Sequence, residues 1–318
     1  MTVPWRDVFP AMTTQFRRDE TLDLEGTSRH IETMIASGSS GLVMLGSLGE
    51  NATLTPEEKR RVVSAAIEVA AGRVPVIATV VETSTAAAKQ FARDMERLGA
   101  DGLMLRPAMI YRADPRETLL HYRDVARATQ LPISCYNNPL AYHVDITPAM
   151  FAELAGVTNL VAIKESSGDV RRITDLRNAV GDRYVLFAGV DDLALECAVL
   201  GADGWIAGIG LAFPGENQRL WDLAVARELD TALPLYRWFT PLAHLDTHVK
   251  FVQYIKLAIQ VAGLGTEWVR APRRVLVGEE RRRILGIIHA GIENRPALSP
   301  APGAPPARKA RPRRSRAR

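Results

Sequence analysis

Short apolar runs alternate with amphipathic segments along most of this chain. The runs are rich in Val, Ile, Leu and Met, which is typical of buried strands, and they cover residues 8–12, 41–45, 74–81, 102–105, 133–137, 160–164, 184–188 and 204–207. The segments between them have helical spacing and cover residues 24–37, 55–71, 83–98, 115–129, a stretch from 147, 170–179, 193–200 and 214–225. Eight strand–helix units in a row predict an α/β TIM (β/α)8 barrel. The alternative, a doubly wound open sheet, more often has a glycine-rich first turn, and residues 8–14 contain no glycine.

The helix boundaries have clear local signals. Thr55, followed by Pro56 and two glutamates, provides the cap, the first-turn proline and the acids of a helix start, and Thr147-Pro148 repeats the cap and the proline. Residues 98–102 and 200–204 both read Leu-Gly-Ala-Asp-Gly, so each ends a helix at glycine and enters a strand through a tight turn. This near-repeat in two units supports the barrel.

Beyond the eighth unit the pattern becomes purely helical and then loses its apolar positions. Helical spacing at residues 233–245, 249–262 and 279–292 predicts a small C-terminal helical extension, so that the barrel takes residues 1–226 and the extension residues 227–295. Residues 296–318 are dominated by Pro, Ala and Arg and cannot bury a core, which predicts a disordered basic tail. A solvated tail is the simpler expectation, and weak binding to nucleic acid or an acidic surface is the alternative.

Charge and cysteine content narrow the class of protein. The net charge is +4 over 318 residues, but residues 297–318 hold seven basic residues and no acid, so the rest of the chain carries −3 once these seven are subtracted. The excess of basic residues therefore lies in the tail. The net charge of the folded part gives no support for nucleic-acid binding. The two cysteines, Cys135 and Cys197, lie in apolar contexts, which predicts buried free thiols. The N-terminus lacks a signal-peptide pattern and no apolar run is long enough to span a bilayer, so we expect a soluble cytoplasmic protein.

One apolar run, at residues 160–163, ends in a charged residue, Lys164, which is followed at once by Glu165 and turn residues. A charge at the end of a buried strand is partly desolvated, which lowers the pKa of a lysine and exposes its neutral amine. Such an amine can attack a carbonyl carbon and form a Schiff base. The alternative is an ordinary lysine whose stem is buried and whose ammonium reaches solvent.

Other polar residues follow the predicted strands, at the end of the barrel where active sites lie. Tyr136 lies 28 residues before Lys164, about one strand–helix unit, so the two side chains should stand on neighbouring strands. A phenol beside an amine can shuttle protons while a carbinolamine forms and breaks, although Tyr136 could also be a core aromatic. After the second strand, residues 46–51 read Gly-Ser-Leu-Gly-Glu-Asn, whose glycines permit a backbone nest for a carboxylate. Glu50 is expected to close a structural hydrogen bond there.

Four motifs together resemble the dihydrodipicolinate synthase/N-acetylneuraminate lyase superfamily over roughly residues 6–293. They are residues 46–50 (Gly-Ser-Leu-Gly-Glu), 136–139 (Tyr-Asn-Asn-Pro), 163–165 (Ile-Lys-Glu) and 189–192 (Gly-Val-Asp-Asp). The resemblance implies a TIM barrel, a homotetramer or dimer, and a small 2-oxo or imino acid substrate. It also implies a covalent lysine Schiff base with no metal and no organic cofactor.

The resemblance assigns roles to individual residues. Lys164 would be the Schiff-base lysine, Tyr136 the proton donor and acceptor, and Ser47 a hydrogen-bond partner of this tyrosine. The remaining implied contacts are with substrate: the backbone beside Leu48 and Gly49 for the carboxylate, and Gly189 and Ile206 for the body of the 2-oxo acid.

Three departures from the family's pattern bear on the substrate. Leu48 stands where the family has a carboxylate-binding threonine, Met109 takes the place of an interface tyrosine, and no arginine follows the tyrosine loop at residues 140–143. In the synthases that arginine holds the carboxylate of the aldehyde. Given these departures, the sequence at residues 43–51, 136–139 and 244–250 most resembles that of the branch that contains 1-pyrroline-4-hydroxy-2-carboxylate deaminase.

We therefore expect a hydrolytic deaminase that converts 1-pyrroline-4-hydroxy-2-carboxylate to 2-oxoglutarate semialdehyde and ammonia, as in hydroxyproline breakdown. The alternative is a 2-oxo acid lyase with the same lysine: a pyruvate aldolase, a sugar-acid dehydratase or a dihydrodipicolinate synthase-like enzyme. A barrel that only binds ligands is the third hypothesis. His244 and His248 are four residues apart and could bind a metal from one helix face, but no third ligand is evident, so we expect packing or interface histidines.

Overall fold

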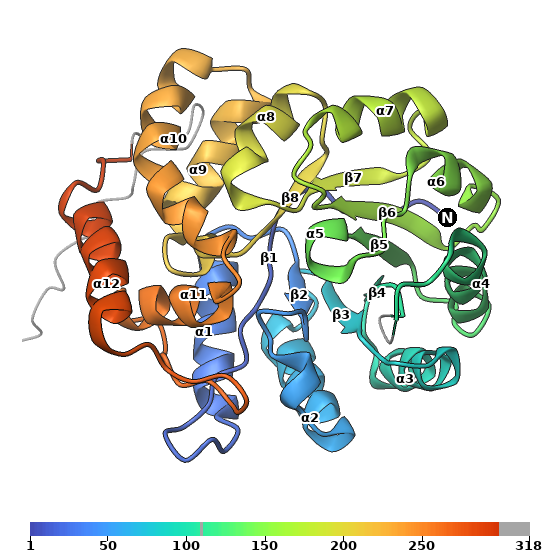
Figure 1. Cartoon of the computed structure of the whole chain (residues 1–318), viewed down its shortest axis with the longest axis horizontal. Coiled ribbons are helices and arrows are strands. Elements are labelled where there is room, and N and C mark those ends of the chain that lie inside the picture. Colours follow the sequence, from blue (N-terminus) through green and yellow to red (C-terminus); the bar gives the residue numbers. More distant parts are fainter. Residues whose placement is uncertain (109–110, 299–318) are drawn as a thin grey trace, which may run out of the picture.

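Eight parallel strands, each followed by helix, form a barrel in a computed structural model that describes residues 1–108 and 111–298 (Figure 1). The strands are β1 Asp7–Pro10, β2 Leu42–Met44, β3 Val76–Val80, β4 Gly102–Leu105, β5 Ile133–Asn137, β6 Leu160–Glu165, β7 Val185–Ala188 and β8 Gly204–Ala207. Their order is β1-β8-β7-β6-β5-β4-β3-β2, and a parallel bridge between Ala11 and Val43 joins the two ends. The predicted TIM barrel is confirmed.

Helices cover the outside of this barrel. They are α1 Leu24–Ala36, α2 Pro56–Ala70, α3 Thr85–Leu98, α4 Pro115–Ala126, α5 Pro139–Tyr142, α6 Pro148–Leu154, α7 Arg171–Val180, α8 Ala194–Val199 and α9 Pro214–Val225. The predicted helix starts are confirmed, because Thr55 accepts from the amide of Glu58 in a capping box and Thr147 accepts from the amide of Met150. The short α5 was not predicted: its single turn has no apolar period that a sequence pattern could show.

The C-terminal region consists of α10 Leu229–Ala243, the 3-10 turn η4 His244–Asp246, α11 Phe251–Val261 and α12 Gly278–Glu293. We predicted the first of these helices at residues 233–245, but it begins four residues earlier and continues through Pro234 and Pro241. Packing of its apolar face against α9 and α12 outweighs the lost backbone hydrogen bonds. No described helix is long and apolar enough to cross a membrane. Most of the predicted tail, from residue 299, lies outside the described residues.

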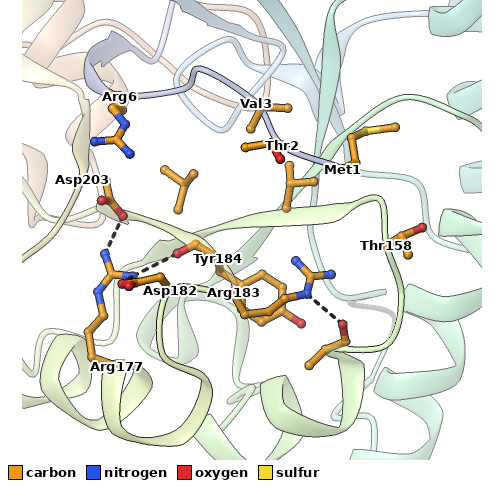
Figure 2. A pocket seen from close by; sticks show the side chains of 13 residues that line it. Met1, Thr2, Val3, Arg6, Thr158, Arg177, Asp182, Arg183, Tyr184 and Asp203 are labelled. Atoms are coloured by element: carbon orange, nitrogen blue, oxygen red, sulfur yellow. Dashed lines mark hydrogen bonds and ion pairs between the residues drawn. The ribbon is translucent and has the colours of Figure 1, made fainter.

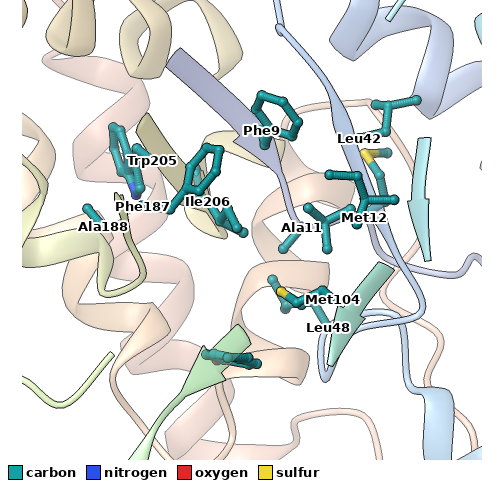
Figure 3. Close-up of a cluster of buried hydrophobic side chains, with 14 of the residues drawn as sticks. Phe9, Ala11, Met12, Leu42, Leu48, Met104, Phe187, Ala188, Trp205 and Ile206 are labelled. Carbon is teal, nitrogen blue, oxygen red and sulfur yellow. The ribbon is translucent and has the colours of Figure 1, made fainter. Parts of the chain in front are cut away.

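The interior of the barrel is a packed apolar core, not a channel (Figure 3). Phe9 of β1 and Phe187 of β7 meet edge to face, with their ring centroids 5.2 Å apart. Gly204 makes this possible, because a Cβ atom at that position would lie 2.4 Å from the ring of Phe187. Leu48 and Ile206 border the same cluster, so the core closes the barrel below the catalytic end.

Candidate active site

Lys164 lies near the carboxyl end of β6, and Tyr136 is its direct neighbour on β5 in the strand register. The amine nitrogen of Lys164 is 4.4 Å from the ring centroid of Tyr136, and the lysine is only 7% exposed. The prediction that the two side chains stand side by side on neighbouring strands is therefore confirmed. The alternative of a lysine that reaches solvent is excluded, since the whole side chain is buried.

Burial lowers the pKa of Lys164 below its ordinary value of 10.5. The nearby groups Asp246, Tyr142 and Asp191 oppose this effect, and Arg106 adds to it. Burial dominates because an ammonium loses its hydration in the barrel mouth. The consequence is a larger fraction of neutral, nucleophilic amine than an exposed lysine would have.

Ser47 contacts a different tyrosine from the one expected. Its hydroxyl oxygen is 2.9 Å from the hydroxyl of Tyr142, so the expected bond to Tyr136 is wrong. The hydroxyl of Tyr136 instead accepts from the side-chain amide of Asn138 at 3.3 Å. The physical reason is α5: Asn138 caps this single turn and folds Tyr142 back over the site, where its ring meets Tyr136 edge to face at 5.4 Å.

Tyr142 and Arg106 are two site residues that the sequence patterns did not reveal. Tyr142 is buried, which raises the pKa of its phenol. The guanidinium carbon of Arg106, just after β4, is 3.9 Å from the ring centroid of Tyr142, within the range of a cation–π contact. Arg106 itself is 8% exposed. The sequence did contain a signal for Arg106. A charged residue directly after the apolar run of β4 repeats the pattern that identified Lys164.

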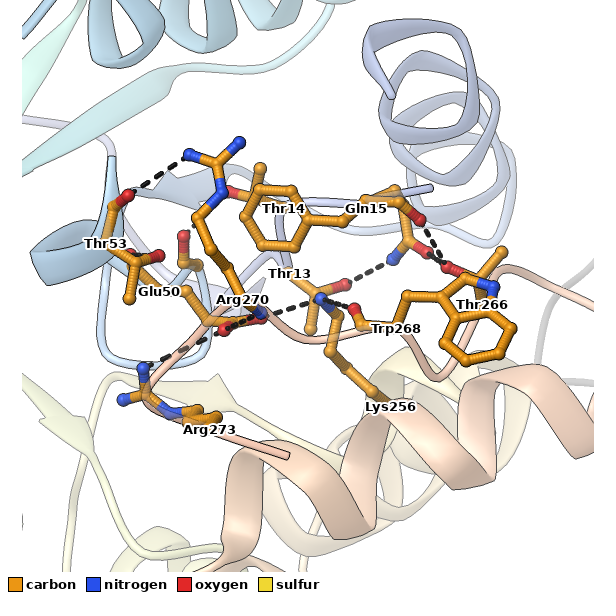
Figure 4. Close-up of polar contacts among 12 residues, drawn as sticks. Thr13, Thr14, Gln15, Glu50, Thr53, Lys256, Thr266, Trp268, Arg270 and Arg273 are labelled. Atoms are coloured by element: carbon orange, nitrogen blue, oxygen red, sulfur yellow. Dashed lines mark hydrogen bonds and ion pairs between the residues drawn. The ribbon is translucent and has the colours of Figure 1, made fainter. Parts of the chain in front are cut away.

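The loop after β2 is held in place by Glu50, as expected. Its carboxylate accepts a hydrogen bond from the amine of Lys256 at 2.7 Å and from the backbone amide of Arg270 at 3.1 Å (Figure 4). Gly49 allows the loop to pass close to the barrel, because a Cβ there would lie 3.0 Å from the Cα of Leu45. These contacts give the loop one defined shape, and carboxylate binding by the backbone beside Leu48 and Gly49 stays a prediction.

Gly189, directly after β7, lies against the stem of Lys164. A Cβ at this position would be 2.9 Å from the Cγ atom of Lys164 and 2.0 Å from the hydroxyl oxygen of Ser166. Only glycine therefore fits here, and its backbone borders the space beside the lysine. Ile206 on β8 is buried and faces the interior cluster. Contact of Gly189 and Ile206 with substrate stays a prediction.

Two carboxylates, those of Asp191 and Asp246, lie beside Gly208, directly after β8. Asp191 accepts from the indole nitrogen of Trp205 at 3.0 Å and from the amides of Gly208 and Ile209 at 3.0 and 2.6 Å. A Cβ on Gly208 would lie 3.2 Å from an oxygen of Asp191 and 2.6 Å from an oxygen of Asp246. The two acids therefore flank the same glycine.

Asp246 was missed by sequence reasoning because it belongs to η4, outside the eight strand–helix units. The two nearby histidines, His244 and His248, make contacts with different residues. His244 lies 3.5 Å from the carboxylate of Asp192, and the ring of His248 stacks on Tyr254 at 4.8 Å. Across residues 1–108 and 111–298, no three His, Cys, Asp or Glu side chains come together as metal ligands.

An open pocket of about 490 Å³ lies at the opposite end of the barrel (Figure 2). The N-terminal residues line it together with Tyr184 and Asp203, which directly precede β7 and β8. Active sites of TIM barrels occupy the carboxyl ends of the strands, so this pocket is separate from the site. A second pocket of about 560 Å³ lies beside α5, where His143 is exposed at its edge.

Comparisons with known proteins identify the family of this chain. The model of the dihydrodipicolinate synthetase family matches residues 4–290. The chain is 30% identical to 4-hydroxy-tetrahydrodipicolinate synthase 1 of Halalkalibacterium halodurans over 277 residues, covering 87% of this chain and 94% of that protein. It is 32% identical to 4-hydroxy-tetrahydrodipicolinate synthase of Methanosarcina barkeri over 290 residues, covering 88% and 98%. The structure of dihydrodipicolinate synthase from Acinetobacter baumannii, complexed with pyruvate, superimposes with a TM-score of 0.86 at 27% identity and covers 90% of this chain and 98% of that one.

These relatives overturn the expected deaminase. They are named as synthases, and the lyase alternative fits them better than hydrolytic deamination. The deaminase was expected from side chains near the barrel mouth. Such side chains vary among enzymes that share the same lysine chemistry. Enzymes of this family are lyases that form a covalent Schiff base through a lysine and use no separate cofactor. The match over residues 4–290 and the relatives that cover nearly the whole chain show that this chain belongs to the dihydrodipicolinate synthetase family.

Proposed function

We propose that this protein is a Schiff-base lyase that joins pyruvate to an aldehyde, or cleaves the product, through Lys164. The observation that carries the proposal is the buried amine of Lys164, 4.4 Å from the ring of Tyr136 at the catalytic end of the barrel. A desolvated amine beside a phenol provides both a nucleophile and a proton carrier.

The reaction begins when the neutral amine of Lys164 attacks the C2 carbonyl carbon of pyruvate. Loss of water from the carbinolamine leaves a cationic iminium, and loss of a proton from C3 gives a neutral enamine. The C3 carbon of the enamine then bonds to the aldehyde carbon, and the aldehyde oxygen takes up a proton to become a hydroxyl. Water finally releases a 4-hydroxy-2-oxo acid and regenerates the amine.

Tyr136 is the proton carrier in this scheme. Its ring lies beside the amine, and its hydroxyl is held by the side chain of Asn138. Ser47 acts on Tyr142, whose phenol has a raised pKa and therefore stays protonated as a hydrogen-bond donor. The hydrogen bond between Ser47 and Tyr142 therefore holds a neutral hydroxyl near the reacting carbons and adds no negative charge to the site.

Two features fit an acidic substrate. The backbone at residues 48 and 49 is expected to bind the carboxylate of pyruvate. Arg106, stacked on Tyr142, supplies a guanidinium on the same side of the site, in a barrel that lacks an arginine at residues 140–143. We infer that Arg106 holds the carboxylate of the aldehyde, since a guanidinium matches a carboxylate in shape and charge.

The first test is reduction by borohydride in the presence of pyruvate. We expect added mass on the peptide that contains Lys164, and none in Lys164→Arg, whose side chain cannot form the adduct. A wild-type protein that gains no mass would exclude the whole Schiff-base proposal. The second test measures consumption of pyruvate with a panel of aldehydes, beginning with L-aspartate 4-semialdehyde, whose condensation and ring closure give 4-hydroxy-tetrahydrodipicolinate. Light scattering on the same sample checks the expected dimer or tetramer.

A further inference from the structure

We propose that Lys256 is a positioning residue for substrate binding. Through Glu50 it holds the loop after β2, residues 45–51, in the shape that presents Ser47 and the amides of residues 48 and 49 to the carboxylate of pyruvate. This inference rests on the proposed function, in which that loop binds pyruvate. It gives the C-terminal helical region, which lies outside the eight strand–helix units, a part in the reaction.

Two residues of the loop have a backbone conformation that is unfavourable for them. Leu45 has a φ angle of 59° and Glu50 has a φ angle of 53°, both in the left-handed region. Residues with a Cβ atom rarely adopt this conformation, and they keep it only where the surrounding structure holds them there. Local preference therefore does not give the loop its shape, and contacts with other segments must maintain it.

The start and the middle of the loop are held by the neighbouring strands. The side-chain amide of Asn51 donates to the carbonyl of Leu45 at 2.9 Å and to that of Thr79, on β3, at 3.3 Å. The hydroxyl of Thr14, after β1, donates to the carbonyl of Gly49 at 2.7 Å. These hydrogen bonds fix the loop to the barrel, but the contacts of the Glu50 side chain come from a different part of the chain.

Glu50 is held by the C-terminal region (Figure 4). Its carboxylate accepts from the amine of Lys256, on α11, at 2.7 Å and from the backbone amide of Arg270 at 3.1 Å. Lys256 also donates to the carbonyl of Trp268 at 2.6 Å, so one amine joins the loop to the segment that follows α11. The side chains of Lys256 and Glu50 have no exposed surface, so water cannot take the place of these contacts.

The chemistry of this ion pair favours a positioning role over a purely stabilising one. Burial removes the hydration of both charges, and an apolar pair of similar volume is often at least as stable. An ion pair adds direction, because the carboxylate must face the amine at hydrogen-bond distance. We infer that this direction keeps the backbone of Glu50 in its left-handed conformation.

The residues between Leu45 and Glu50 are those expected to contact the substrate. The hydroxyl of Ser47 is 2.9 Å from that of Tyr142, and the backbone amide of Glu50 donates to the carbonyl of Ser47 at 3.1 Å. Relaxation of Glu50 to an ordinary φ angle would break this turn and rotate the peptide units at residues 48 and 49. A misplacement of about 1 Å in a site is sufficient to lower activity roughly 100-fold.

The experiment measures pyruvate capture against pyruvate concentration by borohydride reduction and mass spectrometry. It is performed at a temperature at which circular dichroism shows each variant to be folded. We compare the wild type with Lys256→Met, with the double variant Lys256→Met/Glu50→Gln, and with Ile288→Ala as the matched control. Ile288 is a fully buried residue of α12, so its truncation destabilises the C-terminal region, and it belongs neither to the ion pair nor to the loop.

We expect the half-saturating pyruvate concentration to rise at least tenfold in both Lys256 variants. Maximal capture should stay within threefold, because Lys164 belongs to β6 and keeps its own surroundings. The double variant separates position from stability: no charge of the pair remains buried, so its melting temperature recovers in part, while its half-saturating concentration stays high. Ile288→Ala should lower the melting temperature and leave the half-saturating concentration within threefold of the wild type.

The outcomes separate this inference from the proposed function. If the wild type captures pyruvate and the double variant has a half-saturating concentration within threefold of it, only the positioning role is refuted. An equal rise in Ile288→Ala would assign the effect to general instability and would also overturn that role. If Lys256→Met does not fold, the double variant decides. A wild type that captures no pyruvate would overturn the proposed function, and this inference with it.

Discussion

Removing the amine of Lys256 should destabilise the protein strongly, because the buried carboxylate of Glu50 would keep, among the described residues, only the more distant Arg273, 3.8 Å away, as a charged partner. The side chains of Lys256 and Glu50 are both fully buried, and their charged atoms are 2.7 Å apart. Lys256 also donates to the carbonyl of Trp268 at 2.6 Å (Figure 4). Its amine lies over the ring of Phe16. The variant Lys256→Met keeps most of the side-chain volume and removes only the charge and the donors.

The size of the effect follows from the geometry of this pair. Two unit charges at this separation attract by about 6 kcal/mol at an effective dielectric constant of about 20, and desolvation offsets much of that attraction. Breaking a buried pair from one side typically costs about 3–5 kcal/mol. For a protein of this size such a loss lowers the melting temperature by roughly 5–10 °C.

Thermal unfolding, followed by circular dichroism, measures this loss. Lys59→Met is the matched control: Lys59 and Glu82 are also 2.7 Å apart, but Glu82 is 23% exposed, so water can solvate it and the cost should be about 1 kcal/mol or less. The double variant with Glu50→Gln should recover part of the loss, since no buried charge remains. Equal melting temperatures for Lys256→Met and Lys59→Met would refute the reasoning.

Three further predictions concern the site. The rate of pyruvate capture should rise with pH and level off above an apparent pKa below 10.5, since burial lowers the pKa of Lys164; a midpoint at or above 10.5 in the pH profile would contradict this. Gly189→Ala should reduce kcat at least tenfold and cost about 1–3 kcal/mol of stability, because its Cβ would meet Lys164 at 2.9 Å; unchanged kinetics and thermal unfolding would show that the backbone relaxes freely. Arg106→Met should raise KM at least tenfold for an aldehyde with a carboxylate and leave pyruvate capture within threefold; equal KM values in steady-state assays would remove Arg106 from substrate binding.

Part of the site could be predicted from the spacing of residues along the chain. The spacing of Tyr136 and Lys164 was sufficient to place them on neighbouring strands, because one strand–helix unit separates them and parallel barrel strands end at the same rim. The bond of Ser47 was predicted wrongly, because the competing Tyr142 lies in a one-turn helix whose direction depends on the cap at Asn138. The deaminase branch was also predicted wrongly, because side chains at the barrel mouth vary among enzymes that share one lysine chemistry.

By itself, the sequence determined the barrel, the order of its strands and the identity of the buried lysine. These features depend on local periodicity, on caps such as Thr55 and on regular spacing, all of which a linear pattern contains. Only the tertiary structure decided which charges surround that lysine. Asp246 lies 82 residues beyond Lys164 in the chain, and Glu50 pairs with a lysine more than 200 residues away. No periodic pattern encodes such pairs, because they form only when packing brings the C-terminal helices against the barrel mouth.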